Sequence, residues 1–145
     1  MKKFLQKKLK DQKGMTLIEL LAVIVIIAII AAIAIPAISN LIQNSREDAL
    51  VADAQNVLSA ATLYFAENGE EETAAWDGGE ADSDLENYLE DTGNITKFSV
   101  AKDDGTTPTT ITFTGTAGSK TFTDVSVTKN DLDEGRTSLG DADSE

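Results

Sequence analysis

Apolar and polar side chains follow three different patterns along the chain. Residues 15–38 are almost entirely apolar, residues 39–68 carry apolar side chains at helical spacing, and segments near 96–102, 109–114 and 120–128 largely alternate. An apolar run followed by a repeat of about 3.6 residues predicts a long helix, whereas alternation predicts half-buried strands. The expected fold class is α+β, with a long N-terminal helix packed against a small three-stranded antiparallel sheet.

The apolar run is long enough to cross a membrane. As a helix, 15–38 would span ~36 Å, compared with ~30 Å for a hydrocarbon core. Glu19 is its only ionisable side chain, and a carboxylate in hydrocarbon costs at least ~2.5 kcal/mol. A secretory signal cut before Ile35 is an alternative, which would release a conventionally secreted acidic binding domain. Glu19 at the start of the run and Pro36 just after that cut argue against it.

The helix is expected to continue after Pro36 and to stop at Asn68-Gly69. Pro36 predicts a kink in the helix, because proline removes one backbone hydrogen bond. Two stripes follow it and indicate two packing surfaces, one for other helices and one for the globular head. The first stripe is Ile38, Leu41, Ile42, Ser45, Ala49 and Ala52, and the second is Leu50, Ala54, Val57, Leu58, Ala61 and Phe65.

Residues 69–145 are expected to form a globular acidic head. An acidic surface loop is predicted over 70–86, then a short helix over 84–90 and the three strands, the last with a bulge between Phe122 and Val125. The tail after Asn130 is polar, with Leu132 and Leu139 as isolated exceptions, and is expected to be loose or to contact another subunit. The carboxylates of Asp82, Asp84 and Glu86 alternate as in a calcium loop, but the glycine of an EF-hand is missing, and a solvated loop is the simpler interpretation.

Charge divides the chain at the apolar run. Residues 1–14 contain six lysines and one aspartate and have a net charge of +5. Because the whole chain has a net charge of −13, the remaining residues have a net charge of −18. Lysines beside an apolar segment stay cytoplasmic, which places the acidic part outside the cell. So negative a surface disfavours direct binding of nucleic acid. The chain has no histidine and no cysteine, which removes most zinc sites and the usual catalytic triads; no cofactor and no enzymatic activity are expected.

The stretch Lys13-Gly14-Met15-Thr16-Leu17-Ile18-Glu19-Leu20, with its basic leader, apolar run and Pro36, resembles the prepilin signature of type IV pilins. The absence of cysteine favours a Gram-positive source. The resemblance implies that residues 1–14 are a leader, that a prepilin peptidase cuts after Gly14, and that the new amine on Met15 is methylated. It further implies a major pilin that polymerises into a surface filament through an assembly platform and ATPase. A pseudopilin of a type II secretion or DNA-uptake system would share the same N-terminus.

Glu19 has two explanations. The carboxylate would pair with the Met15 amine of a neighbouring subunit and set the register of the filament, since pairing offsets the desolvation of both charges. Thr16 and Glu19 also have the spacing of a capping box, which would stabilise the start of the helix. Before assembly the subunit would be a single-pass membrane protein with a cytoplasmic N-terminus. After assembly it would lie at the cell surface. In type IV pilus filaments the segment ahead of the proline is commonly melted, so the resemblance implies, as the alternative to a kink at Pro36, that residues 28–36 unwind on assembly.

Overall fold

The computed structural model describes residues 2–78 and 84–140, with side chains from Thr16 onward except those of Asp84 and Glu86. Its first element, α1, is a helix over Lys2–Glu67. The chain divides into two compact units, of which the first ends at Leu41 and the second begins at Ile42. The helix therefore begins well before the apolar run and includes most of the expected leader. Lysine, leucine and glutamine, which dominate the leader, all have high helix propensity.

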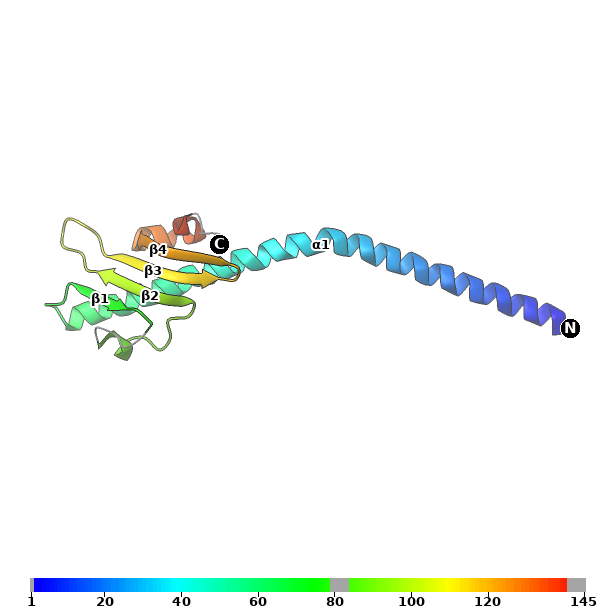
Figure 1. The fold of residues 1–145 in the computed structure, drawn as a ribbon, viewed down its shortest axis with the longest axis horizontal. Coiled ribbons are helices and arrows are strands. Elements are labelled where there is room, and N and C mark those ends of the chain that lie inside the picture. Colours follow the sequence, from blue (N-terminus) through cyan, green and yellow to red (C-terminus); the bar gives the residue numbers. More distant parts are fainter. Residues whose placement is uncertain (1, 79–83, 141–145) are drawn as a thin grey trace. The chain divides into compact units, whose positions relative to one another are not determined.

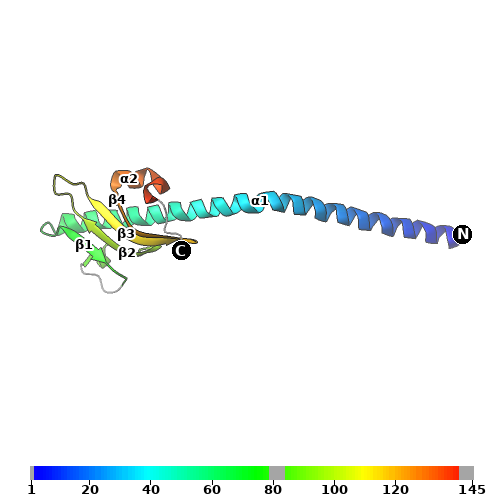
Figure 2. The same ribbon diagram turned by 45° about the horizontal axis from the view of Figure 1, so that its top comes forward.

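The second unit contains a four-stranded antiparallel sheet in the order β1-β2-β3-β4. The strands are β1 Thr73–Trp76, β2 Ile95–Ala101, β3 Thr110–Ala117 and β4 Lys120–Thr128. Figures 1 and 2 show this sheet lying along the C-terminal part of α1. The helix α1 ends at Glu67, one residue before the predicted stop at Asn68. The α+β class and three expected strands are confirmed, and the strand count was too low by one.

The missed strand, β1, lies inside the region predicted to be an acidic loop. It pairs with β2 from Thr73 opposite Ala101 to Trp76 opposite Phe98. The rings of Trp76 and Phe98 have centroids 6.0 Å apart. A strand of four residues, two of them alanine, is too short to show an alternation of apolar and polar side chains. This edge strand is therefore stabilised by its pairing with β2 and by the contact of Trp76 rather than by a strong strand preference of its own residues. A 3-10 helix, η1, over Asp84–Asn87 occupies the predicted short helical segment.

The predicted bulge in β4 is confirmed. Phe113 pairs with Val125 and Gly115 with Phe122, so β4 holds one extra residue between the two pairs. Asp124 lies in this bulge with a φ of 50° and is the single non-glycine residue with positive φ in the described part of the chain. Aspartate tolerates this conformation better than most residues.

The core of the second unit forms between one face of α1 and one face of the sheet. The predicted second stripe of the helix is buried throughout, whereas Ser45, Ala49 and Ala52 of the first stripe are exposed. The sheet contributes the apolar side chains that alternate along its strands, although Val125 beside the bulge is only partly buried. The buried apolar residues of the sheet are Ala74, Ile95, Phe98, Val100, Ile111, Phe113, Ala117, Phe122 and Val127.

The C-terminal segment is ordered up to Gly140, the last residue that the structure describes, and is not the loose tail that was one of the two expectations. Helix α2 covers Lys129–Asp133 and the 3-10 helix η2 covers Gly135–Leu139. A capping box between Thr128 and Asp131 starts α2. Leu132 and Leu139 are 1% and 3% exposed. The two leucines that looked isolated in the sequence therefore anchor the segment in the core.

Candidate processing and assembly segment

The first unit exposes nearly all of its apolar side chains. From Leu17 to Leu41, every large apolar side chain is between 49% exposed, at Val25, and 71% exposed, at Ile33. The most apolar 18-residue window of this helix has a mean hydropathy of 3.2, and none of it is buried. By length and composition it is a candidate membrane span. So large an apolar surface calls for a covering of lipid or of other protein chains.

The proposed processing residues lie within this helix. Gly14 and Met15 are part of α1, and Glu19 follows Met15 by one helical turn. The Glu19 side chain is exposed and forms no ion pair with another described residue. In the uncleaved chain the Met15 nitrogen belongs to a peptide bond and carries no charge. An ion pair between that nitrogen and a carboxylate requires cleavage first.

The capping-box interpretation of Thr16 and Glu19 is wrong for the uncleaved chain. A capping box satisfies the free N–H groups at the start of a helix. Here α1 begins at Lys2, so Thr16 lies inside the helix and the amides beside it have helical acceptors one turn earlier. The motif could act as a cap only at a new helix end created by cleavage.

Pro36 lies inside α1, which is helical on both sides of it. Residues 28–36 are helical, so a melted stretch does not describe the single subunit. Proline lacks an N–H and therefore removes one backbone hydrogen bond at this point. Melting on assembly stays a prediction about the filament.

Three residues join α1 to the hairpin between β3 and β4 at the start of the second unit. Gln43 Nε2 donates to the Ala117 carbonyl at 2.7 Å and to Glu47 Oε1 at 3.0 Å. Lys120 Nζ lies 2.7 Å from the same Glu47 oxygen. Burial alone would raise the pKa of Glu47, but the hydrogen bonds from Lys120 and Gln43 outweigh it, and the pKa is lowered.

This contact was not predicted from the sequence. Gln43 and Glu47 are spaced as neighbours on one helix face, which is the only local signal. Their partners lie more than seventy positions away in the chain. The contact ties the hairpin to the helix within a few residues of the exposed apolar segment.

A metal centre is not evident in the described part of the chain. No group of three or more aspartate or glutamate side chains there could hold a metal ion. The suggested calcium ligands Asp82, Asp84 and Glu86 lie outside the residues whose side chains are described. In the loop after β2, Asp104 Oδ1 accepts hydrogen bonds from the Thr106 and Thr107 amides, which accounts for that carboxylate as part of a turn.

Comparison with known proteins identifies the N-terminal segment. Residues 9–35 match the family model of the prokaryotic N-terminal methylation motif. No curated protein and no solved structure matches the chain. The matched range includes the positively charged stretch before Gly14, the residues around the expected cut and most of the apolar run, and proteins with this motif are structural rather than enzymatic. Together with the exposed apolar helix that follows it, the motif supports a type IV pilin-like or pseudopilin-like prepilin, and it implies processing by prepilin peptidase and assembly into polymers.

Proposed function

We propose that this protein is the major structural subunit of a type IV pilus, cut after Gly14 and assembled into a filament at the cell surface. The observation that carries the proposal is the apolar helix that follows the methylation motif, uncovered along its described length and interrupted only by Glu19. Before assembly, lipid would cover this helix. A helical polymer buries it against copies of itself.

Cleavage would change the physical state of this helix in two ways. Loss of residues 1–14 removes a net charge of +5, which otherwise holds that end on the cytoplasmic side. It also creates an amine on Met15, at the new end of the apolar segment. The subunit then becomes easier to withdraw from the membrane and gains a positive group that needs a partner.

Glu19 supplies that partner from a neighbouring subunit. Inside a bundle of apolar helices the effective dielectric constant is low, so an amine and a carboxylate attract strongly at short distance. A subunit shifted by one helical turn would leave both charges unpaired and desolvated. The pair therefore favours one axial register over its neighbours.

The exposed stripe of Ser45, Ala49 and Ala52 supports the same proposal. These small side chains lie on α1 within the second unit, yet they are not covered by its sheet. Small side chains allow two helices to approach closely. We assign this stripe to contacts between neighbouring α1 helices in the filament.

The test is Glu19→Ala, with Glu70→Ala as the matched control because Glu70 is an exposed carboxylate of the second unit. We expect the Glu19 variant to be inserted in the membrane and cut after Gly14, but to yield almost no filaments by electron microscopy. The control should give filaments in normal amount. Normal filament yield from Glu19→Ala would contradict the proposed pairing of Glu19 with the Met15 amine of a neighbouring subunit.

The mass of the mature N-terminus tests the processing step separately. We expect the main filament component to begin at Met15 and to carry one methyl group. A chain beginning at Ile35 would indicate conventional secretion instead. Short filaments, together with a secretion or DNA-uptake defect on deletion, would assign the chain to the pseudopilins.

A further inference from the structure

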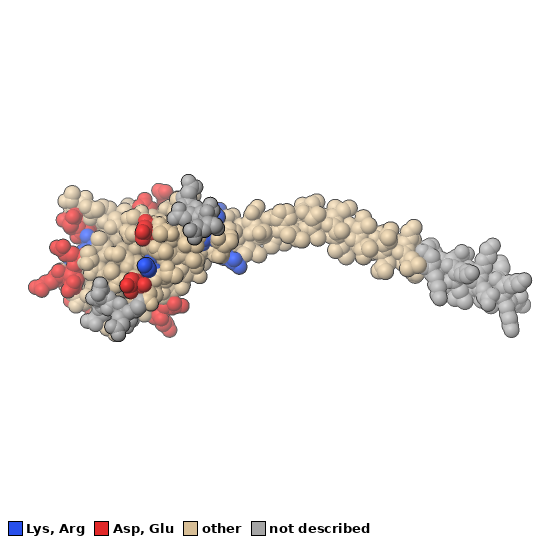
Figure 3. All heavy atoms as spheres, in the orientation of Figure 1, with Lys and Arg blue, Asp and Glu red and all other residues tan. Residues whose placement is uncertain are grey.

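The second unit carries charge of opposite sign at its two ends. The end at which α1 enters contains Arg46 of the helix and Lys120 of the β3-β4 hairpin. The opposite end, where α1 stops at Glu67, contains three consecutive glutamates at 70–72. Figure 3 shows acidic side chains gathered at the end of this unit remote from the entry of α1, and basic side chains beside that entry. Each end therefore matches the opposite end of a second copy in charge.

Arg46 is held over the turn of the β3-β4 hairpin. A Cβ added at Gly118 would lie 2.6 Å from Arg46 Nη1 and 2.7 Å from Arg46 Cδ, so the missing side chain of this glycine makes room for the arginine. The guanidinium group forms no hydrogen bond and no ion pair with any described residue. Its five N–H donors form a planar fork that matches a carboxylate.

The carboxylates that follow Arg46 in the chain are already paired with other cations. Lys120 Nζ lies 2.7 Å from Glu47 Oε1, and Arg136 Nη1 lies 3.3 Å from Asp48 Oδ2. Neither of these carboxylates compensates the charge of Arg46. Arg46 therefore gives this end of the second unit an uncompensated positive charge.

The glutamates at 70–72 are the unpaired groups of the opposite end. All three are exposed, and none forms an ion pair within the described part of the chain. Lys102 lies beside them, since its N–H donates to the Glu72 carbonyl at 2.8 Å, but its Nζ donates to the Gly69 carbonyl at 3.0 Å. Three adjacent carboxylates repel one another, and a cation supplied from outside offsets that repulsion.

One copy cannot join its own two ends. Arg46 and Glu67 lie on the same helix, 21 positions apart, which corresponds to ~32 Å along its axis. This distance is far beyond the reach of an arginine side chain, so a carboxylate of 70–72 can meet Arg46 only if it belongs to another molecule. In a polymer of parallel subunits, the two ends of successive copies face each other. Such head-to-tail contacts generate rings or filaments.

We propose that Arg46 of one subunit binds the carboxylates of 70–72 of the next subunit along the filament, an inference that rests on the proposed assembly. The guanidinium group forms two parallel hydrogen bonds to one of these carboxylates. The loss of a single glutamate, as in Glu70→Ala, leaves two and keeps the contact. This interface lies between second units and is separate from the pairing of Glu19 with the Met15 amine.

Cross-linking of introduced cysteines tests the contact directly, because the chain has no cysteine of its own. Arg46→Cys and Glu71→Cys would be combined in the full-length protein, and its filaments would be treated with a short bis-maleimide. A head-to-tail contact joins position 46 of each subunit to position 71 of the next, so we expect a ladder of multimers on a denaturing gel. Either substitution alone should give no ladder, because the contact does not join a position to its own copy.

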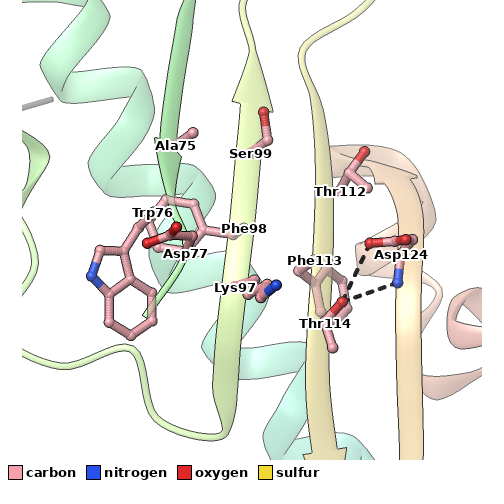
Figure 4. Close-up of a pocket in the computed structure, with 10 residues that line it drawn as sticks. All are labelled: Ala75, Trp76, Asp77, Lys97, Phe98, Ser99, Thr112, Phe113, Thr114 and Asp124. Carbon is pink, nitrogen blue, oxygen red and sulfur yellow. Dashed lines mark hydrogen bonds between the residues drawn. The ribbon is translucent and has the colours of Figure 1, made fainter. Parts of the chain in front are cut away.

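Arg46→Cys with Ser99→Cys is the matched control pair. Ser99 is exposed on the face of β2 turned away from α1 and belongs to neither end (Figure 4). This pair should give no ladder. Filaments of the Arg46 and Glu71 pair that cross-link no more than the control overturn the contact and leave the proposed function standing. Absence of filaments from the unmodified protein overturns both.

Charge exchange tests the same contact without a cross-linker. Arg46→Glu should lower the filament yield at least tenfold. Lys97→Glu is its control, because Lys97 is exposed on the sheet, lies at neither end and has no ion pair with a described residue. The control should keep the yield within twofold. Replacing all three glutamates at 70–72 with lysine in the Arg46→Glu chain reverses the contact and should restore at least half the yield. Equal yields from Arg46→Glu and Lys97→Glu, or no recovery in the combined variant, overturn the proposal.

Discussion

Truncation of Leu132 should strongly destabilise the second unit. The side chain is 1% exposed and belongs to the core, although α2 has only five residues. Leu132→Ala removes three carbon atoms, worth about 2.4 kcal/mol at ~0.8 kcal/mol for each buried group. The cavity left behind adds to this, so the free energy of unfolding should fall by about 3 kcal/mol.

The neighbouring backbone keeps the cavity from closing easily. Gln55 of α1 donates from Nε2 to the Leu132 carbonyl at 3.1 Å, and the capping box at Thr128 holds the other end of α2. These contacts do not involve the Leu132 side chain and persist in the variant. They restrict the inward movement of α2 that would otherwise fill the space.

The measurement is urea unfolding of the full-length protein in detergent, followed by the fluorescence of Trp76. Leu63→Ala is the matched control, because Leu63 removes the same atoms from a side chain that is 53% exposed. Its effect should stay within about 0.5 kcal/mol. If Leu132→Ala differs from Leu63→Ala by less than that amount, the C-terminal segment does not belong to the cooperative core, and the reasoning fails.

Two further predictions concern the contacts of α1 within the second unit. Gly93 has a φ of 60° and a Cβ there would overlap the Asp53 carboxylate, so Gly93→Ala should cost more than about 1 kcal/mol in urea unfolding. Gly105→Ala, with positive φ but open space, should cost less; equal losses would refute the role of Asp53. The lowered pKa of Glu47 means that its contribution to stability is complete above its ordinary value of 4.5 and is lost as the pH falls below it. Glu47→Gln should therefore flatten the acid side of the stability curve, and an unchanged curve would contradict this.

The sequence predicted the elements whose side-chain pattern is long and regular. The buried stripe from Leu50 to Phe65 repeats over four helical turns, and three strands alternate over six or more residues. The strand Thr73–Trp76 has only four residues and two alanines, so no period can be read from it. Leu132 and Leu139 were visible as apolar residues, but their burial depends on a turn at Thr128 that brings them back over the core.

The two candidate sites differ in the same way. The processing segment is a linear motif, so Gly14, Met15 and Glu19 could be identified from the residues adjacent to them in the sequence. The contact of Gln43 and Glu47 with Lys120 joins residues far apart in the chain, and no local pattern encodes that pairing. A hollow of about 260 Å³, lined among others by Lys97, Thr112 and Asp124, likewise takes its walls from separate strands. Only the bulge at Asp124 left a trace in the sequence, as a slip in the alternation of the last strand.

The contact between Gln43, Glu47 and the β3-β4 hairpin also bears on mechanical force. A pull on the N-terminal end of α1 enters the second unit at Ile42, one residue before this contact. Because the part of α1 in the second unit lies along the strands (Figure 1), a pull along the axis of that part acts parallel to its packing surface and loads the buried side chains from Leu50 to Phe65 together. Contacts loaded in shear break as a group, whereas a pull across the sheet would open them one by one. The packing of the second unit therefore resists a pull along the axis of its own part of α1.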